Sequence, residues 1–209
     1  MMEIESSNRE IEQTVFLVDD DKAIGEALCD LLDAAGFTAR SFASAEEFLD
    51  AWNPSMAGCL VLDVRLPGMS GMELQSRLAA AKIALPIVVI TAHGDIPMVR
   101  KALKAGAVEF LTKPFQDDEL LTAVEQAFTL DLERRRQNKI AESVRARIQS
   151  LSERERQVIA LVTTGLTNRE IAEKLYLSVV TVKLYRRQAM EKMRADSLAD
   201  LVKIWEQQS

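Results

Sequence analysis

The residues of this chain that could carry out chemistry lie within two positions of the end of a short apolar run: Asp19, Asp20, Asp63, Thr91 and Lys113. Short apolar runs bounded by turn residues are typical of buried parallel strands. Hydrophobic burial does not require a carboxylate at the end of such a strand. We therefore take Asp63, which follows Leu62 and shortly precedes a Pro-Gly turn, as the candidate reactive group.

Three of these residues are aspartates that we expect to meet at one edge of a sheet. Like charges at short range are unfavourable unless a cation neutralises them. Mg²⁺, with Mn²⁺ as the alternative, suits Asp19, Asp20 and Asp63, because it needs few carboxylates and keeps several waters. Asp63 is then a candidate nucleophile on phosphorus. Lys113 and the Thr91 hydroxyl would stabilise the oxygens of the transferring phosphoryl group.

The elements that must position these residues alternate between strand and helix over residues 14–128. We expect strands at 14–18, 37–42, 58–63, 86–91 and 107–111, and helices at 22–35, after Ser44, at 70–80, at 96–105 and from 117 onward. This alternation predicts a doubly wound (βα)5 parallel sheet of the flavodoxin-like kind, with helices on both faces. In such a sheet ligands bind at the carboxyl ends of the strands.

The remainder of the chain has the character of a linker followed by an all-α domain. Residues 129–149 contain no Pro or Gly and predict a long linker helix, with a possible interruption near Asn138. Either a solvated linker or a dimerising coil fits its short apolar stripe. Residues 150–209 predict four helices, in which a short helix, a tight turn and a longer basic helix form a helix-turn-helix. Residues 1–13 are polar and acidic, and we expect a flexible tail.

Composition and charge limit the classes of function. The chain has 209 residues, of which 48% are hydrophobic and 28% charged, as in folded globular proteins. The net charge of −6 conceals 10 basic and 8 acidic residues from Leu151 onward, so the second part can bind nucleic acid. Cys29 and Cys59 form no CxxC pair, which fits a reducing cytoplasm. No apolar run is long enough to span a membrane, and we expect no membrane contact.

The helix expected at 179–193 carries four basic residues: Lys183, Arg186, Arg187 and Lys192. Lys183 and Arg187 are four residues apart and therefore face the same way. Such a face suits the major groove of double-stranded DNA, where phosphate contacts give affinity and base contacts give specificity.

The motifs together resemble a known family. Residues 14–128 resemble the receiver domain of bacterial two-component response regulators, through Val18-Asp-Asp-Asp21, Leu62-Asp-Val-Arg-Leu-Pro-Gly-Met-Ser-Gly71, Ile90-Thr-Ala-His-Gly-Asp95 and Phe110-Leu-Thr-Lys-Pro-Phe115. Residues 151–205 resemble the LuxR-type (NarL-type) effector domain, through Leu151-Ser-Glu-Arg-Glu155, Gly165-Leu-Thr-Asn-Arg-Glu-Ile-Ala172 and Thr181-Val-Lys183. The combination is similar to the FixJ branch.

The resemblance implies a role for each residue at the sheet edge. Asp63 would be the phospho-acceptor, with a sensor histidine kinase as donor. Asp20 would be a direct Mg²⁺ ligand, Asp19 its supporting partner, and the Arg65 backbone carbonyl a further ligand. Thr91 would be the switch hydroxyl and Lys113 would hold the phosphoryl group, before a cis peptide to Pro114. Phe110 would be the aromatic switch, although a plain core residue is the alternative. His93, the only histidine, would be a loop residue near the site.

The resemblance also implies how the output is delivered. Lys183, Leu184 and Arg187 would reach bases, while Thr181 and Arg186 would contact phosphates, and Lys192 is a further candidate DNA-binding residue. Phosphorylation would drive homodimerisation, and the dimer would bind promoter DNA and activate transcription together with RNA polymerase. Three places depart from the family: Val179-Val180, Leu184-Tyr185 and Tyr176, which would be strained if its position needs a positive φ.

Two other functions are compatible with parts of the pattern. A phosphatase or phosphotransferase of the haloacid-dehalogenase type also uses an aspartate nucleophile, but it places an acidic residue two positions later, where this chain has Arg65. A receiver that only sequesters partner proteins would not need the basic helix. We therefore expect a regulator and not an enzyme.

Overall fold

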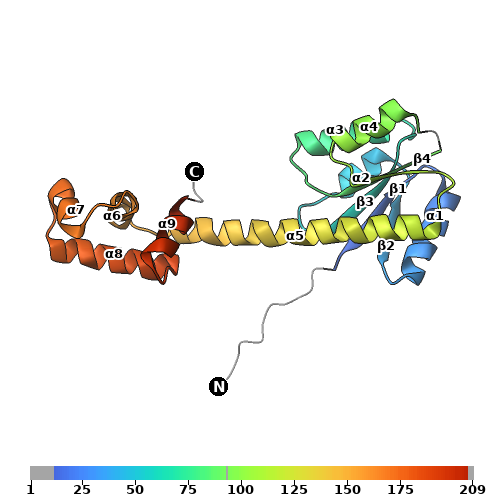
Figure 1. The fold of residues 1–209 in the computed structure, drawn as a ribbon. Coiled ribbons are helices and arrows are strands. Elements are labelled where there is room, and N and C mark those ends of the chain that lie inside the picture. The colour runs from blue at the N-terminus through green and yellow to red at the C-terminus, as the bar shows by residue number, and fades with distance from the viewer. Residues whose placement is uncertain (1–11, 93, 207–209) are drawn as a thin grey trace, which may run out of the picture. The chain divides into compact units, whose positions relative to one another are not determined.

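The computed structural model describes residues 12–92 and 94–206, so most of the expected tail and His93 lie outside the described residues (Figure 1). The chain divides into two compact units, Met1–Arg134 and Arg135–Ser209. One helix, α5 (Asp117–Gln149), contributes residues to both units. Among the described residues no helix is long and apolar enough to cross a membrane.

The first unit is built on a parallel sheet of five strands in the order β2-β1-β3-β4-β5. The strands are β1 (Thr14–Val18), β2 (Thr38–Phe42), β3 (Gly58–Asp63), β4 (Ile87–Thr91) and β5 (Glu109–Thr112). The register pairs Asp63 with Ile90 and Thr91 with Thr112, so the carboxyl ends of β3, β4 and β5 meet at one edge. This confirms the predicted fold class.

Helices cover both faces of this sheet. They are α1 (Lys22–Ala34), α2 (Ala45–Ala51), α3 (Gly71–Ala80), α4 (Ile96–Lys104) and the first part of α5. The first four begin at side chains that accept hydrogen bonds from backbone N–H groups of the first turn: Asp21, Ser44, Ser70 and Asp95. Such caps satisfy N–H groups that have no partner within the helix.

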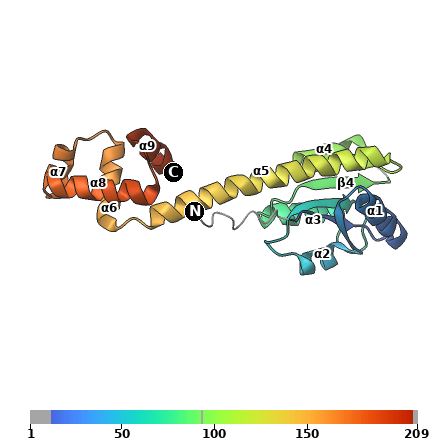
Figure 2. The ribbon, with the colours of Figure 1, turned by 90° about the horizontal axis from the view of Figure 1, so that it is seen from below.

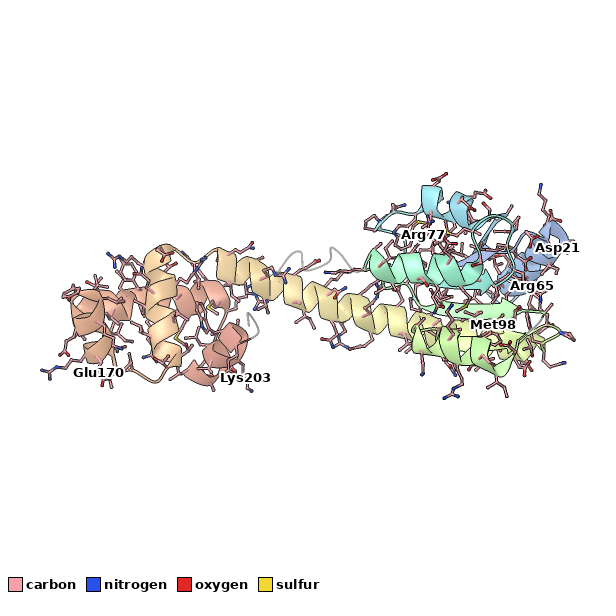
Figure 3. All side chains as sticks on the ribbon, turned by 90° about the horizontal axis from the view of Figure 1, so that it is seen from above. Asp21, Arg65, Arg77, Met98, Glu170 and Lys203 are labelled. Atoms are coloured by element: carbon pink, nitrogen blue, oxygen red, sulfur yellow. The ribbon has the colours of Figure 1, made fainter. Side chains whose placement is uncertain are left out.

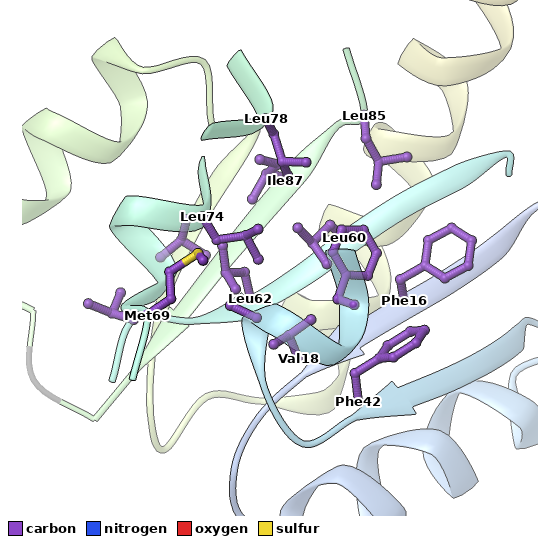
Figure 4. Packing of buried hydrophobic residues seen from close by; sticks show 14 of the residues in the cluster. Phe16, Val18, Phe42, Leu60, Leu62, Met69, Leu74, Leu78, Leu85 and Ile87 are labelled. Carbon is purple, nitrogen blue, oxygen red and sulfur yellow. The ribbon is translucent and has the colours of Figure 1, made fainter. Parts of the chain in front are cut away.

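Two hydrophobic clusters hold the helices on the sheet. On one face Phe16, Val18, Leu60 and Leu62 pack with side chains of α2, α3 and α4. Figure 4 shows these four strand residues with Leu74 and Leu78 of α3. On the other face the alternate residues of the same strands pack with α1 and α5. Since successive side chains of a strand point to opposite faces, a central strand such as β3 is apolar on both faces up to Leu62, and all six of its residues, including the final Asp63, are buried.

Helix α5 runs from Asp117 to Gln149 without the interruption that was considered near Asn138. Asp131, beyond the last residue of the expected receiver, is fully buried, and its Oδ2 accepts a hydrogen bond of 2.9 Å from the N–H of Gly58. Near the other end of α5, Val144 and Ile148 are buried in the core of the second unit. The helix therefore forms part of the packing of each unit.

The second unit adds four helices, α6 (Glu153–Thr163), α7 (Asn168–Leu175), α8 (Val179–Met193) and α9 (Leu198–Glu206), which Figure 2 shows from below. Reciprocal capping boxes begin α6, at Ser152 and Glu155, and α7, at Thr167 and Glu170. The short α7, the turn and the longer α8 form the predicted helix-turn-helix. Tyr176 ends α7 in the left-handed region, with φ of 55°, and its side chain is 95% exposed.

Candidate functional site

The site at the sheet edge is organised by one ammonium group between two carboxylates. Lys113, which follows β5, places Nζ 2.6 Å from Asp63 Oδ2 and 2.6 Å from Asp19 Oδ2. The other oxygen of Asp63 accepts a hydrogen bond of 2.9 Å from the Arg65 N–H. Asp19 Oδ1 likewise accepts from the Asp21 N–H at 3.0 Å. The two aspartates are buried, and these donors compensate their charge.

The electrostatics of this group favour a charged lysine. Burial lowers the pKa of the Lys113 ammonium, but its hydrogen bonds and ion pairs with Asp19 and Asp63 outweigh that effect, so the pKa lies above its usual value. Two carboxylates thus share one permanent cation in a site largely shielded from water. An incoming anionic group would find an ammonium already in place beside Asp63.

The fit to a divalent cation is partial. The donors expected for it are carboxylate and carbonyl oxygens, which Mg²⁺ prefers. Asp20, however, is exposed at the edge of the site, while the Lys113 ammonium binds both buried aspartates. Among the residues that the structure describes, no three acidic, histidine or cysteine side chains are gathered around one point. Figure 3 labels Asp21 and Arg65 at this same edge.

Thr91 and Phe110 complete the candidates at this edge. Thr91 ends β4 and is fully buried, and its carbonyl accepts a hydrogen bond of 2.8 Å from the Lys113 N–H. Phe110, on β5, is half-buried and packs against the cluster that covers one face of the sheet. The Lys113–Pro114 peptide is cis, as predicted.

Gly71 is a residue of this site to which the sequence patterns assigned no role. It begins α3, and a Cβ added there would lie 2.1 Å from the Asp63 carbonyl oxygen. Its N–H donates a hydrogen bond of 3.0 Å to the Val64 carbonyl. Only glycine lets the helix start so close to the backbone of the reactive aspartate. The Ser-Gly pair at the start of the expected helix was the available signal.

The exposed face of α8 is the second candidate site. Lys183, Leu184 and Arg187 are exposed, whereas Thr181 and Arg186 are half-buried. Arg186 donates a hydrogen bond of 3.3 Å to Asn168 Oδ1, which links α8 to α7. A shallow hollow of about 680 Å³ is lined mostly by charged side chains: Lys183, Arg186, Arg187, Glu191, Arg194 and Asp196, with Asn168, Met190 and Ala195.

Lys192 is placed differently from the other basic residues of α8. Its Nζ lies 2.7 Å from Oε2 of Glu155, a residue that is 3% exposed. Burial raises the pKa of Glu155, but the ammonium of Lys192 and the N–H and hydroxyl of Ser152 outweigh this and hold the pKa below its usual value. The contact joins α8 to α6 inside the domain. The expected contact of Lys192 with DNA stays a prediction, since its side chain remains 41% exposed.

Two family models match most of the chain. A response regulator receiver domain matches residues 15–125, and the luxR family of bacterial regulatory proteins matches residues 149–205. The chain belongs to the response regulators with a LuxR-type output domain. The first unit is thus its receiver domain, and the second unit contains its DNA-binding output domain.

Named relatives place this response regulator close to FixJ. It is 47% identical over 192 residues to Nodulation protein W of Bradyrhizobium diazoefficiens, covering 92% of this chain and 85% of that protein. It is 42% identical over 190 residues to the Transcriptional regulatory protein FixJ of the same organism, covering 91% and 93%. The response regulator is accordingly a two-component, DNA-binding regulator of transcription.

Solved structures agree with this placement. The response regulator StyR matches with a TM-score of 0.87 and 48% identity, over 93% of this chain and 98% of StyR. Full-length FixJ from B. japonicum matches with a TM-score of 0.58 and 41% identity, over 94% and 97%. Both similarities extend over receiver and output domains together.

Proposed function

We propose that this response regulator accepts a phosphoryl group on Asp63 from a sensor histidine kinase, and that the phosphorylated form dimerises and binds promoter DNA to activate transcription. The observation that carries the first part is the Lys113 ammonium held 2.6 Å from Asp63 and 2.6 Å from Asp19 at the carboxyl edge of the sheet. Family membership supports the kinase and the DNA as partners. Contact with RNA polymerase and a cytoplasmic location are part of the same proposal.

In the proposed phosphoryl transfer, Asp63, Lys113 and Thr91 each have a separate role. A carboxylate oxygen of Asp63 forms a bond to phosphorus while the bond from phosphorus to the kinase imidazole nitrogen breaks. That nitrogen keeps the electron pair and takes up a proton. Lys113 neutralises charge on the transferred group, and the Thr91 hydroxyl donates to another of its oxygens.

Mg²⁺ is the proposed cofactor of this reaction, with Mn²⁺ as a substitute. Asp19, Asp20, Asp63 and the Arg65 carbonyl would hold it, and it would supply further neutralisation of phosphoryl oxygens. Asp20 is exposed and therefore free to turn towards the two buried aspartates. Phe110, half-buried beside this edge, is the proposed partner of Thr91 in signalling the phosphorylated state.

The phosphorylation site is tested with acetyl phosphate and Mg²⁺. The wild-type chain should gain one phosphoryl group by intact mass, and Asp63→Asn should gain none. Asp33→Asn, an exposed aspartate on α1, is the matched control and should behave as wild type. Phosphorylation of Asp63→Asn to the wild-type extent would refute the assignment.

The DNA interface is proposed to consist of Lys183, Leu184 and Arg187 at bases and of Thr181 and Arg186 at phosphates. Lys192 is proposed as a further DNA contact. Lys183→Ala and Arg187→Ala should each weaken binding and reduce the dependence of affinity on salt. Lys203→Ala, on α9 and labelled in Figure 3, is the control and should leave both unchanged. Dimerisation is tested by sedimentation, in which the phosphorylated chain should have twice the mass of the monomer.

The haloacid-dehalogenase alternative gains no support from the site. The position two residues after Asp63 is occupied by Arg65, whose backbone N–H donates to Asp63 and whose side chain is exposed. No carboxylic acid is available at that position to protonate a leaving group. We expect an acyl phosphate that persists as a signal, and no turnover of small phosphate esters.

A further inference from the structure

The outward face of α8 contains apolar as well as charged side chains. Helical geometry of about 100° per residue aligns five residues along this face: Val180, Lys183, Leu184, Arg187 and Glu191. The opposite side packs into the core of the output domain through Val182, Ala189 and Met193. The face that remains for a partner is therefore apolar towards the start of α8 and charged towards its end.

Val180 lies on the midline of this face and is 77% exposed. Leu184, one turn later, is 51% exposed. A β-branched residue at an exposed position adds little to the stability of a helix, because valine is a weaker helix former than alanine. Packing within the domain therefore does not account for Val180. The neighbouring Val179, 39% exposed, points about 100° away from the midline.

We infer that Val180 determines DNA specificity by contacting the 5-methyl group of a thymine in the major groove, and that Leu184 contacts a second one. The inference rests on the proposed DNA-binding function and specifies its ligand. Residues at the start of a recognition helix reach base edges, and thymine is the base that presents a methyl group there. Lys183 and Arg187 lie on the same face as Val180 and Leu184, and their positive charges attract the anionic DNA duplex. We therefore take DNA as the partner that covers these two apolar side chains.

The same geometry disfavours other bases opposite Val180. Guanine and adenine present the N7 acceptor at that edge of the groove, and an apolar side chain would remove water from it without replacing its hydrogen bond. Cytosine presents a C–H group at C5 and lacks the methyl group that Val180 would contact. Arg187 differs, because its Nε donates to Glu191 Oε1 at 2.9 Å and the pair orients the guanidinium within the face. We therefore expect thymine next to the bases that the cationic residues read.

The experiment uses the full-length chain treated with acetyl phosphate and a duplex selected from random sequences. Each thymine of the selected half-site is replaced singly by deoxyuridine, which lacks the methyl group but keeps every hydrogen-bonding group. At two thymines, one opposite Val180 and one opposite Leu184, each replacement should weaken wild-type binding about fourfold, the effect of removing one buried methyl group. Val180→Ala should bind the thymine and uracil duplexes equally at one of these two positions, while Val179→Ala should still distinguish them at both.

Each outcome bears on the inference separately from the proposed function. If a sequence is enriched but uracil is tolerated at every position, the methyl contact is refuted and DNA binding stands. If Val180→Ala still distinguishes thymine from uracil at both positions where the wild type does, Val180 is not the residue that contacts the methyl group. If no sequence is enriched at all, the proposed function fails together with the inference. Alanine favours the helix more than valine does, and circular dichroism of Val180→Ala checks that the domain remains folded.

Discussion

Replacement of Asp131 by alanine tests how α5 is attached to the receiver. The Asp131 carboxylate is fully buried, accepts a hydrogen bond from the Gly58 N–H and forms an ion pair with Arg134. Gly58 begins β3, the strand that ends at Asp63, and it cannot be replaced without strain: its φ is 127°, and a Cβ would lie 1.9 Å from the Thr14 carbonyl oxygen. The carboxylate thus connects α5 to a point where the backbone has no freedom to adjust.

The cost of Asp131→Ala can be estimated from these contacts. A buried N–H group left without an acceptor costs about 1–3 kcal/mol. The Arg134 side chain is 29% exposed and loses its charge partner, which adds about 1 kcal/mol after allowance for solvent screening. We expect the free energy of unfolding of the receiver to fall by about 3 kcal/mol. Asp131→Asn keeps one acceptor oxygen for Gly58 and should lose about half as much.

Urea unfolding monitored by tryptophan fluorescence measures this quantity. Trp52 packs against the receiver core and Trp205 against the output core, so Trp205→Phe leaves a receiver-specific signal. Glu125→Gln, an exposed carboxylate on α5, is the matched control and should change the free energy of unfolding by less than about 0.5 kcal/mol. The reasoning is refuted if Asp131→Ala is as stable as Glu125→Gln.

Three further changes have definite expected outcomes. Because Lys192 and the N–H and hydroxyl of Ser152 together lower the pKa of Glu155 more than burial raises it, the ionised carboxylate stabilises the output domain above pH 4.5, and this stability is lost as the pH falls through the lower folded-state pKa; Lys192→Met should flatten that dependence in unfolding followed by Trp205 fluorescence. Tyr176→Gly should raise the stability of the output domain by about 1 kcal/mol in the same assay, since it relieves a left-handed φ and loses little packing; a decrease would show that Tyr176 has contacts that offset its strain. Gly71→Ala should abolish phosphorylation by acetyl phosphate, because its Cβ would displace the Asp63 carbonyl, and undiminished phosphorylation would contradict the close approach.

The local pattern of apolar and capping residues was sufficient to predict the bounds of β3 and α8, the elements that carry the two sites. β3 was predicted at its observed bounds because a strand covered on both faces is an uninterrupted apolar run, which here ends directly before Asp63. α8 was predicted at Val179–Met193 because Ser178 supplies an N-cap and the buried residues recur with helical spacing. The order of strands and helices alone predicted that Asp63 and Thr91 lie at the same edge of the sheet. The roles assigned to these residues remain predictions.

Contacts between residues far apart in the chain could not be read from the sequence. The Glu155–Lys192 ion pair spans 37 residues and the Asp131–Gly58 hydrogen bond spans 73, and neither has a signature in local spacing. The bounds of β5 were also displaced: we expected residues 107–111, whereas the strand is Glu109–Thr112. Its pairing with β4 decides those bounds, and hydrophobicity alone placed the strand too early.

The burial of Val144 and Ile148 in the core of the output domain has a consequence for how such regulators can be recombined. A chimaera that joins this output domain to a foreign receiver must inherit these two residues, because a junction at residue 150 would remove part of a hydrophobic core. Asp131 must likewise remain with this receiver, because its carboxylate accepts the hydrogen bond from Gly58 at the start of β3. The interchangeable stretch of α5 is therefore short, between Arg135 and Ser143, and gene fusions that preserve both domains should have their junctions there.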